Sequence, residues 1–243
     1  MNLDQTGQHY MIDKELIQFI VNYGELRKDD VVLEIGCGHG ALTRELVKKC
    51  KVVAIDIEKT ILDIHSNQLT LVQGNVLEEI DQLRKKHDFN KIIANIPFSI
   101  SEPLLRKMLK TDFDLAILTV GKSFAELLTK KDNRLGILAN NFYEVEILQT
   151  IRPSAFFPQP RVNSAVIRLS PLALDDLDRK AVIYRKLLFL DDKKLKNALE
   201  TILKDKTKKE IAALCKSEFY KKKLFQLTNE EFMELDSDLT KLL

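Results

Sequence analysis

The sequence has little of several features that would mark it as a secreted, membrane-spanning or disordered protein. Its three cysteines, Cys37, Cys50 and Cys215, match neither the spacing of a metal site nor a disulfide framework. No apolar run approaches the roughly 20 residues of a membrane span, and the amino terminus is polar, so neither a membrane segment nor a signal peptide is expected. The net charge of +2 is too small to indicate a nucleic-acid partner. We therefore expect a globular protein of the cytoplasm.

Glycine and proline are both absent after Pro171. The segment beyond is rich in Lys, Leu, Asp and Glu, and its apolar residues recur at helical spacing, as in Leu195 and Leu199. Thr228 and Glu231 fit a capping box that opens the last helix. The change in composition predicts two domains, residues 1–172 and a small helical domain of residues 173–243.

The first domain alternates short apolar runs with helical patterns. Asp13 can cap a helix over residues 14–23 that Gly24 ends. Further helices are expected at residues 42–49, 59–66 and 102–109. The runs expected to form strands are apolar and β-branched, as in strands buried on both faces of a sheet: residues 31–35, 52–55, 69–72, 91–94 and 115–118. This alternation predicts an α/β fold with a doubly wound, mainly parallel sheet, and residues 145–151 and 164–169 are expected as an antiparallel pair at its edge.

A glycine-rich turn follows the first of these strands. Gly36, Gly38 and Gly40 have G-x-G-x-G spacing without the later glycine of a dinucleotide loop, and such a turn aims backbone N–H groups at a ligand. Glu34 disfavours an anionic pyrophosphate and favours a cationic amino-acid or sulfonium ligand. Asp56, at the end of the next strand, can accept both ribose hydroxyls. Together these residues indicate S-adenosylmethionine (SAM). The alternative is a plain tight turn with Asp56 as a helix cap.

Two later strand ends carry asparagines. Asn75 can hydrogen-bond the adenine of the cofactor, or can be an ordinary turn residue. Asn95 opens the segment Asn95-Ile96-Pro97-Phe98. The Asn95 side-chain oxygen and the backbone carbonyls near Pro97 can hold both hydrogens of an exocyclic amine, and Phe98 can stack on the base. This pattern indicates methylation of a base amine by alignment, with no metal and no general base. The alternative is an Asn-x-Pro turn beside a core phenylalanine.

The chain resembles the KsgA family of ribosomal RNA adenine dimethyltransferases over nearly its whole length. Residues 7–13, GQHYMID, are similar to the family's GQxFL-x-D segment, and residues 95–101, NIPFSIS, to its N-L-P-Y-x-I-S. Residues 153–166, PSAFFPQPRVNSAV, resemble its P-x-A-F-x-P-x-P-K-V-x-S-A-V. Residues 185–189 and 194–199 are similar to its carboxyl-terminal helices.

The resemblance implies a Rossmann-like SAM-dependent methyltransferase sheet in residues 1–172 and a helical rRNA-binding domain in residues 173–243. It implies a catalytic role for Asn95, Pro97 and Phe98, with Phe98 stacking on the target base and Phe156 or Phe157 walling the pocket. The residues implied in cofactor binding are His9, Met11, Gly36, Gly38, Asp56, Asn75 and Asn95.

The implied reaction is two successive methylations on N6 of two adjacent adenosines near the 3′ end of small-subunit rRNA, with S-adenosylhomocysteine as product. The partner would be a pre-ribosomal particle, so the enzyme would take part in ribosome biogenesis. A monomer without membrane contact is expected. Asn75 stands where the family usually has Asp, which predicts weaker SAM binding.

Two other functions fit parts of the sequence. An Erm-type enzyme methylates an adenosine of large-subunit rRNA, confers macrolide resistance and shares both core motifs. A ribosome-assembly factor that has lost catalysis would keep the fold and the RNA contacts. For RNA contact in any of these functions, the sequence offers Arg134, Arg152, Arg161 and residues 221–223, all lysines.

Overall fold

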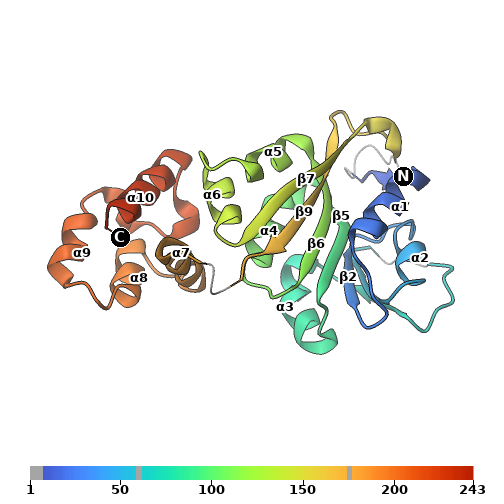
Figure 1. The fold of residues 1–243 in the computed structure, drawn as a ribbon, viewed down its shortest axis with the longest axis horizontal. Helices are drawn as coiled ribbons and strands as arrows, with labels where there is room; N and C mark the ends of the chain where they lie inside the picture. The colour runs from blue at the N-terminus through green and yellow to red at the C-terminus, as the bar shows by residue number, and fades with distance from the viewer. Residues whose placement is uncertain (1–7, 59–61, 174–176, 243) are drawn as a thin grey trace. The chain divides into compact units, whose positions relative to one another are not determined.

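The computed structural model describes residues 8–58, 62–173 and 177–242 (Figure 1). It divides into a first unit, Met1–Thr129 with Glu144–Pro171, and a second unit, Lys130–Tyr143 with Leu172–Leu243. The second unit therefore includes a segment before residue 172 as well as the carboxyl-terminal helices. Two hydrogen bonds explain this grouping, because the Arg134 backbone N–H donates to Asn229 Oδ1 at 2.8 Å and its guanidinium to the Leu227 carbonyl at 2.9 Å.

The first unit is built on a seven-stranded sheet, counted over the described residues, in the order β4-β3-β2-β5-β6-β9-β7. Strands β4, β3, β2, β5 and β6 are parallel to one another, and β9 runs antiparallel to β6. The strands are β2 Val31–Ile35, β3 Lys51–Asp56, β4 Leu69–Gln73, β5 Lys91–Asn95, β6 Leu115–Gly121, β7 Tyr143–Ile151 and β9 Ser164–Pro171. The predicted mainly parallel sheet is confirmed, and β9 and β7 complete one edge of it.

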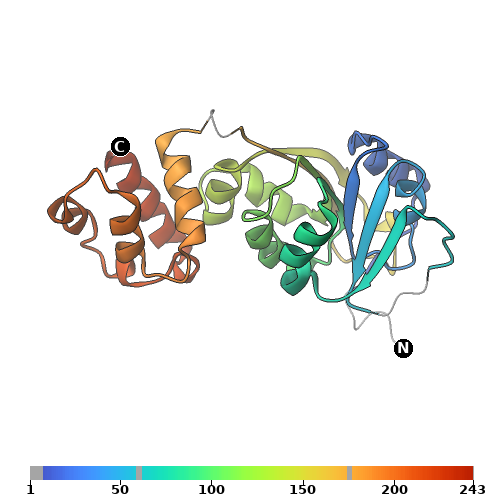
Figure 2. The same cartoon turned by 90° about the horizontal axis from the view of Figure 1, so that it is seen from below.

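Helices cover both faces of this sheet (Figure 2). On one face, α1 and α2 pack in a core with strand residues such as Val32, Ile93 and Ile117. On the other face, side chains of α4 and α5 meet those of β6 and β9. The helices of this unit are α1 Lys14–Tyr23, α2 Thr43–Leu46, α3 Val76–His87, α4 Ser101–Met108 and α5 Lys122–Thr129.

The first helix forms as its sequence predicts. Asp13 Oδ1 accepts from the Leu16 N–H at 3.1 Å, and Gly24 is the carboxyl cap. The face that carries Leu16, Ile17, Ile20 and Val21 is buried, as the 3.6-residue spacing requires. Both ends of the helix and its buried face are therefore confirmed.

Three local expectations are wrong. Residues 62–66 form no helix, and residues 59–61 of the same expected helix lie outside the described residues. The helix expected over residues 42–49 is only the four-residue α2. Strand β4 is not buried on both faces: it is the free edge of the sheet, and Leu71 is 44% exposed. Apolar composition alone cannot distinguish a central strand from an edge strand, because strand order is set by tertiary pairing.

The second unit is helical. It contains α6 Arg134–Asn140, α7 Arg179–Phe189, α8 Leu195–Ile202, α9 Lys208–Leu214 and α10 Asn229–Leu242. Tyr184 and Phe232 stack in its core with ring centroids 5.6 Å apart, and the Tyr184 hydroxyl donates to Asp236 at 3.1 Å. The predicted capping box is confirmed, because the Thr228 N–H donates to Glu231 and the Glu231 N–H to the Thr228 hydroxyl.

A small two-stranded ribbon holds two distant segments of the first unit together. Strand β1, Tyr10–Met11, pairs antiparallel with β8, Phe156–Phe157. In the register, Tyr10 lies opposite Phe157 and Met11 opposite Phe156. This pairing brings the amino-terminal segment to the carboxyl edge of the parallel strands, where Gly36, Asp56 and Asn95 also lie.

A buried lysine stabilises the other end of the sheet, where the parallel strands begin. The Lys91 ammonium donates to the carbonyls of Gly24 and Glu25 at 3.0 and 2.6 Å and pairs with Asp30 at 2.9 Å. Burial acts to raise the pKa of Asp30, but hydrogen bonds from Asn90 and the Arg27 backbone, together with Lys91, lower it overall. Every donor of the ammonium is thus satisfied, which a buried charge requires.

We predict that Lys91→Met lowers the free energy of unfolding by about 3 kcal/mol, because Asp30 and two carbonyls lose a buried partner. Chemical denaturation followed by circular dichroism measures this loss. Lys51→Met, at an exposed lysine that begins strand β3 of the same sheet, is the matched control and should change stability by less than about 0.5 kcal/mol. Equal losses for the two variants would contradict the importance of this network.

Candidate active site

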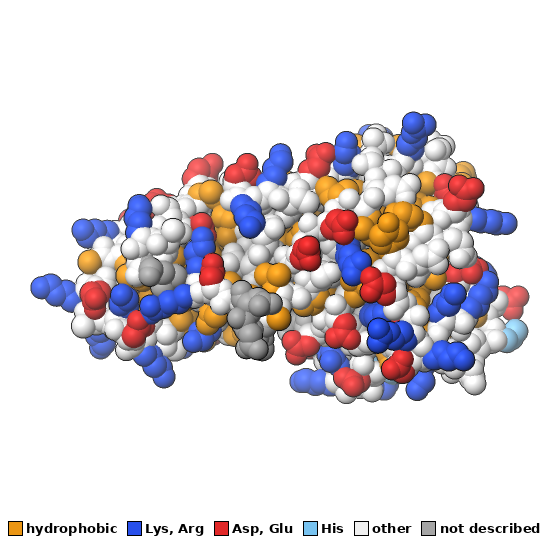
Figure 3. Space-filling view, viewed as in Figure 1, with side chains coloured by type: hydrophobic (Ala, Val, Ile, Leu, Met, Phe, Trp, Pro, Cys, Tyr) orange, Lys and Arg blue, Asp and Glu red, His pale blue; other side chains and the backbone are white. Residues whose placement is uncertain are grey.

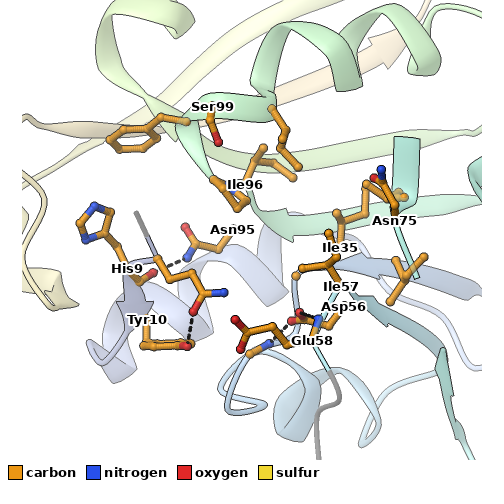
Figure 4. Close-up of a pocket in the computed structure, with 18 of the residues that line it drawn as sticks. His9, Tyr10, Ile35, Asp56, Ile57, Glu58, Asn75, Asn95, Ile96 and Ser99 are labelled. Atoms are coloured by element: carbon orange, nitrogen blue, oxygen red, sulfur yellow. Dashed lines mark hydrogen bonds between the residues drawn. The ribbon is translucent and has the colours of Figure 1, made fainter. Parts of the chain in front are cut away.

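A cavity of about 410 Å³ opens at the carboxyl ends of the parallel strands (Figure 4). Its size is in the range of sites for small molecules and cofactors. The ends of β2, β3 and β5 supply part of the wall, and β1 and residue 156 of β8 supply another part. The lining residues are Gln8, His9, Tyr10, Ile35, Gly36, Gly38, His39, Ile55, Asp56, Ile57, Glu58, Gly74, Asn75, Val76, Asn95, Ile96, Pro97, Phe98, Ser99, Ile100, Phe156 and Ser164.

The glycine loop, residues 36–40, lines the cavity with backbone atoms of Gly36 and Gly38, which carry no side chain. Gly36 and Gly38 have φ values of 71° and 49°, a region that strains other residues. A Cβ at Gly38 would also lie 2.9 Å from the Tyr10 ring, which covers the loop and contacts the His39 ring with centroids 4.1 Å apart. Glycine at position 38 therefore lets the amino-terminal segment lie directly over the loop.

Two carboxylates stand at one end of the cavity. Asp56 Oδ2 accepts from the Gly38 N–H at 2.9 Å, and its Oδ1 accepts from the Glu58 N–H at 3.0 Å. Burial raises the pKa of Tyr10, and the negative charges of Glu58 and Asp56 add to this effect. This end of the cavity therefore suits hydroxyl donors or a cationic group. Glu58 was missed in the sequence, although it lies only two residues after Asp56.

Glu34 does not line the cavity. Its side chain is buried at 1% exposure, and Oε2 has no hydrogen-bond partner in the described part of the chain. Burial raises the pKa of Glu34 to about 8, and the neighbouring Thr43 offsets only part of that effect. The carboxyl is mostly neutral at pH 7. The expectation that Glu34 meets a cationic ligand therefore finds no support in the geometry.

Asn95 ends β5 with its side chain at the centre of the wall. Its Nδ2 donates to the His9 main-chain carbonyl at 2.9 Å, and its Oδ1 points away from that bond (Figure 4). The His9 ring is held too, because Nδ1 donates to the Pro158 carbonyl at 2.8 Å. These bonds fix which end of the amide faces the cavity. The oxygen is left as an acceptor in a cavity wall.

An aromatic ring stands above this acceptor. Phe98 follows Pro97 in the short helix η2, Phe98–Ile100, and is 37% exposed. Its ring lies against the backbone of Gly121, where an added Cβ would be 3.7 Å from the ring. The ring of His9 lies 6.1 Å from it, centroid to centroid. A flat face beside a hydrogen-bond acceptor suits a heteroaromatic amine.

Asn75 lines the cavity and also begins α3. Its Oδ1 accepts from the Leu77 N–H at 3.1 Å, and its Nδ2 donates to Glu78 at 2.9 Å. The helix α3 was missed in the sequence because its cap was considered only as a cofactor contact or a turn. Asn75 is both a helix cap and a wall residue.

The structure brings most of the predicted site residues to this one cavity, and leaves two of them out. Those at the cavity are His9, Gly36, Gly38, Asp56, Asn75, Asn95, Pro97, Phe98 and Phe156. Met11 is buried in the core at 5% exposure, and Phe157 is 61% exposed on the outside. Neither side chain belongs to the cavity wall. Tyr10 and Gln8 were missed, although both neighbour His9 in the amino-terminal motif.

A cavity at the carboxyl edge of a doubly wound parallel sheet, with a glycine loop and a strand-end carboxylate, is the arrangement of enzymes that bind a nucleotide cofactor. Residues 2–237 match the family model described as ribosomal RNA adenine dimethylase. The chain belongs to this ribosomal RNA adenine dimethylase family. A methyltransferase family implies SAM as the methyl donor.

Individual relatives agree with the family model. A "Probable ribosomal RNA small subunit methyltransferase A" from Methanopyrus kandleri is 36% identical, over 80% of this chain and 75% of the relative. The crystal structure of a dimethyladenosine transferase from Plasmodium falciparum is similar with a TM-score of 0.65 and 23% identity, over 96% of this chain and 98% of that one. The 23S rRNA methyltransferase ErmE gives 0.59 and 19%, over 95% and 99%. At these identities, the two structures show a shared fold.

Two kinds of feature are absent from the described residues. They contain no helix long and apolar enough to cross a membrane. They also contain no group of three or more His, Cys, Asp or Glu side chains arranged to hold a metal ion.

We predict that Glu34→Gln raises stability at alkaline pH. The folded chain keeps the Glu34 proton up to about pH 8, whereas the unfolded chain releases it near 4.5, so the free energy of unfolding falls as the pH rises between these values. Glutamine does not ionise, so the Glu34→Gln variant does not lose stability in this way. Near pH 4 it should match the wild type, and near pH 9 it should be more stable by roughly 4 kcal/mol.

Thermal and urea unfolding across this pH range measure the effect. Glu45→Gln is the control, because hydrogen bonds from Lys48 and Gln18 lower the pKa of that carboxyl. It should give no gain at alkaline pH. A Glu34→Gln variant that is no more stable than the wild type at pH 9 would show that the carboxyl is not held neutral.

Proposed function

We propose that this protein uses SAM to dimethylate N6 of two adjacent adenosines near the 3′ end of small-subunit rRNA, and so acts in ribosome biogenesis in the cytoplasm. In this proposal the first unit binds SAM and the target base, and the helical second unit binds rRNA. The observation that carries the proposal is the fixed Asn95 amide, whose Nδ2 donates to His9 and whose Oδ1 remains available in the cavity wall.

The cavity fits SAM. The glycine loop offers backbone without side chains at Gly36 and Gly38, and the Asp56 and Glu58 carboxylates can receive ribose hydroxyls. Asn75 lines the part of the cavity where its side-chain oxygen could accept a hydrogen bond from the adenine amine of SAM. When bound, SAM supplies an electrophilic methyl group on a cationic sulfur. The residues proposed to hold it are His9, Gly36, Gly38, Asp56, Glu58, Asn75 and Asn95.

The amine loop, residues 95–98, can position the acceptor nitrogen. An adenine amine is a poor nucleophile because its lone pair is conjugated with the ring, so catalysis depends on orienting it. Asn95 Oδ1 would accept one amine hydrogen. The Pro97 carbonyl already accepts from the Ile100 N–H at 3.0 Å, so we assign the second acceptor role to the Ile96 carbonyl, which has no such bond within the described residues. Two acceptors would direct the lone pair at the methyl group.

Phe98 would hold the plane of the base. Its exposed ring face lies at the cavity mouth, and stacking on an aromatic ring contributes about 1–3 kcal/mol per base. Phe156 closes the cavity from the ribbon at 2% exposure. An extruded adenosine could therefore be held by stacking while its amine meets Asn95.

The test is methyl transfer from labelled SAM to small ribosomal subunits that lack the dimethyladenosines, with naked large-subunit rRNA in parallel. Nucleoside mass spectrometry should find N6,N6-dimethyladenosine in the small-subunit rRNA. Product only in large-subunit rRNA would instead make the protein an Erm-type enzyme. SAM binding without product in either RNA would favour an assembly factor.

In this assay, Asn95→Ala should lower kcat at least about 100-fold, because the amine loses an aligned acceptor. Titration calorimetry should show a much smaller change in the Kd for SAM. The matched control is Asn141→Ala in the second unit, which also removes an amide that donates to a main-chain carbonyl, that of Ile137 at 2.7 Å. If Asn141→Ala keeps full activity while Asn95→Ala loses it, the effect belongs to the site.

We also predict that Asn75→Asp tightens SAM binding about tenfold, because a charged acceptor forms a stronger hydrogen bond with the adenine amine. Aspartate is as good a helix cap as asparagine, so α3 should persist. Calorimetry with SAM measures the change, and circular dichroism checks the fold. Unchanged or weaker binding would argue that Asn75 does not contact the cofactor.

A further inference from the structure

Phe157 is an exposed aromatic residue that the proposed reaction does not use. It is 61% exposed, whereas its neighbour Phe156 is 2% exposed and lines the cavity. The alternation of side chains along a strand places the two rings on opposite faces of the ribbon: Phe156 packs in the core with Met11, and Phe157 projects from the face that carries Tyr10. Phe157 therefore lies outside the pocket that would hold the target base.

The ring nevertheless stands near the cavity mouth. Phe157 lies directly opposite Tyr10 in the β1–β8 pair, and opposed residues project from the same face with Cβ atoms about 5 Å apart. Tyr10 lines the cavity. The surface around Phe157 is thus continuous with the proposed active site.

The backbone that carries the ring is held on both sides. Strand pairing fixes Phe157 itself, and the next carbonyl, that of Pro158, accepts from the His9 ring at 2.8 Å. His9 in turn accepts from Asn95 through its main-chain carbonyl. The backbone that carries the exposed ring is therefore linked through His9 to the hydrogen bond that orients the Asn95 amide.

Two exposed arginines flank Phe157 in the sequence, and both could contact a polyanion. Acidic and basic side chains are interleaved on the face shown in Figure 3, and many cations have partners: Lys221 pairs with Glu218 and Lys222 with Glu231. Within the described residues, only three arginines have side chains with no hydrogen bond or ion pair: Arg27, Arg152 and Arg161. Arg152 and Arg161 are exposed, and they bracket the segment that carries Phe157.

We propose that Phe157 is a stacking platform for a nucleotide that flanks the target adenosine, and that Arg152 and Arg161 contact the adjoining phosphates. This inference rests on the proposed function and deepens it. A target of two adjacent adenosines places a second base beside the extruded one. Phe157 would stack on this second base and hold it in place while the target adenosine occupies the cavity.

Steady-state methyl transfer to unmethylated small subunits tests the platform. Phe157→Ala should raise the KM for subunits about tenfold and leave kcat and the Kd for SAM within about twofold. Phe157→Tyr keeps a ring and should restore the KM. Tyr23→Ala removes a 39% exposed aromatic ring at the end of α1, outside the cavity lining, and should have no effect.

Binding without SAM separates this proposal from the reaction. The anisotropy of a fluorescent single-stranded oligoadenylate should show about tenfold weaker binding for Phe157→Ala. Arg152→Ala and Arg161→Ala should each reduce the slope of log K against log salt by about 1.

Unchanged KM and oligoadenylate affinity in Phe157→Ala would overturn the platform, even if the wild type dimethylates small subunits. So would an equal loss in Phe157→Tyr, or a dimer in sedimentation that Phe157→Ala dissociates, since the ring would then serve an interface between copies. A wild type that binds oligoadenylate through Phe157 but transfers no methyl would instead overturn the proposed function alone.

Discussion

The site depends on the hydrogen bond from Asn95 Nδ2 to the main-chain carbonyl of His9. Asn95 ends a strand at the centre of the sheet, and His9 belongs to a segment joined to the sheet through the ribbon with residues 156–157. A free amide could present nitrogen or oxygen to the cavity with similar ease. Because the carbonyl of His9 can only accept, it selects the nitrogen and leaves the oxygen available as the acceptor that an amine requires. The position of the His9 carbonyl thus determines that the cavity wall presents a hydrogen-bond acceptor at Asn95.

The amino-terminal segment also packs closely against the glycine loop. Tyr10 lies so near Gly38 that a Cβ would overlap its ring, and Asp56 is held to the loop by the Gly38 N–H. Three segments far apart in the chain therefore share one small volume. Glu34, buried two residues before Gly36, has no hydrogen-bond partner on Oε2 among the described residues, and burial favours its neutral carboxyl. Membership of the ribosomal RNA adenine dimethylase family places these features in an enzyme that must hold a cofactor and an RNA base side by side.

Several parts of the fold were predictable because their causes are local in sequence. The first helix has its cap at Asp13 and its stop at Gly24, and the central strands are apolar enough to be buried on both faces. The edge strand β4 has the same composition as the central strands, so its exposure followed from strand order and could not be read from its residues. Residues 62–66 have helical spacing but no helix, since the spacing of apolar residues does not ensure that a helix can pack.

The sequence by itself determined the class of fold, the order of the strand-end motifs and nine of the residues that line the cavity, because parallel strands bring their carboxyl ends to one edge. The tertiary structure alone decided which face each side chain presents. Met11 and Phe157 share motifs with His9 and Phe156, yet strand alternation and the pairing of β1 with β8 direct Met11 into the core and Phe157 to the surface. It also decided which end of Asn95 meets the cavity and that Glu34 is buried away from the cavity wall. Each of these outcomes depends on contacts between residues distant in the chain, for which a linear pattern carries no signal.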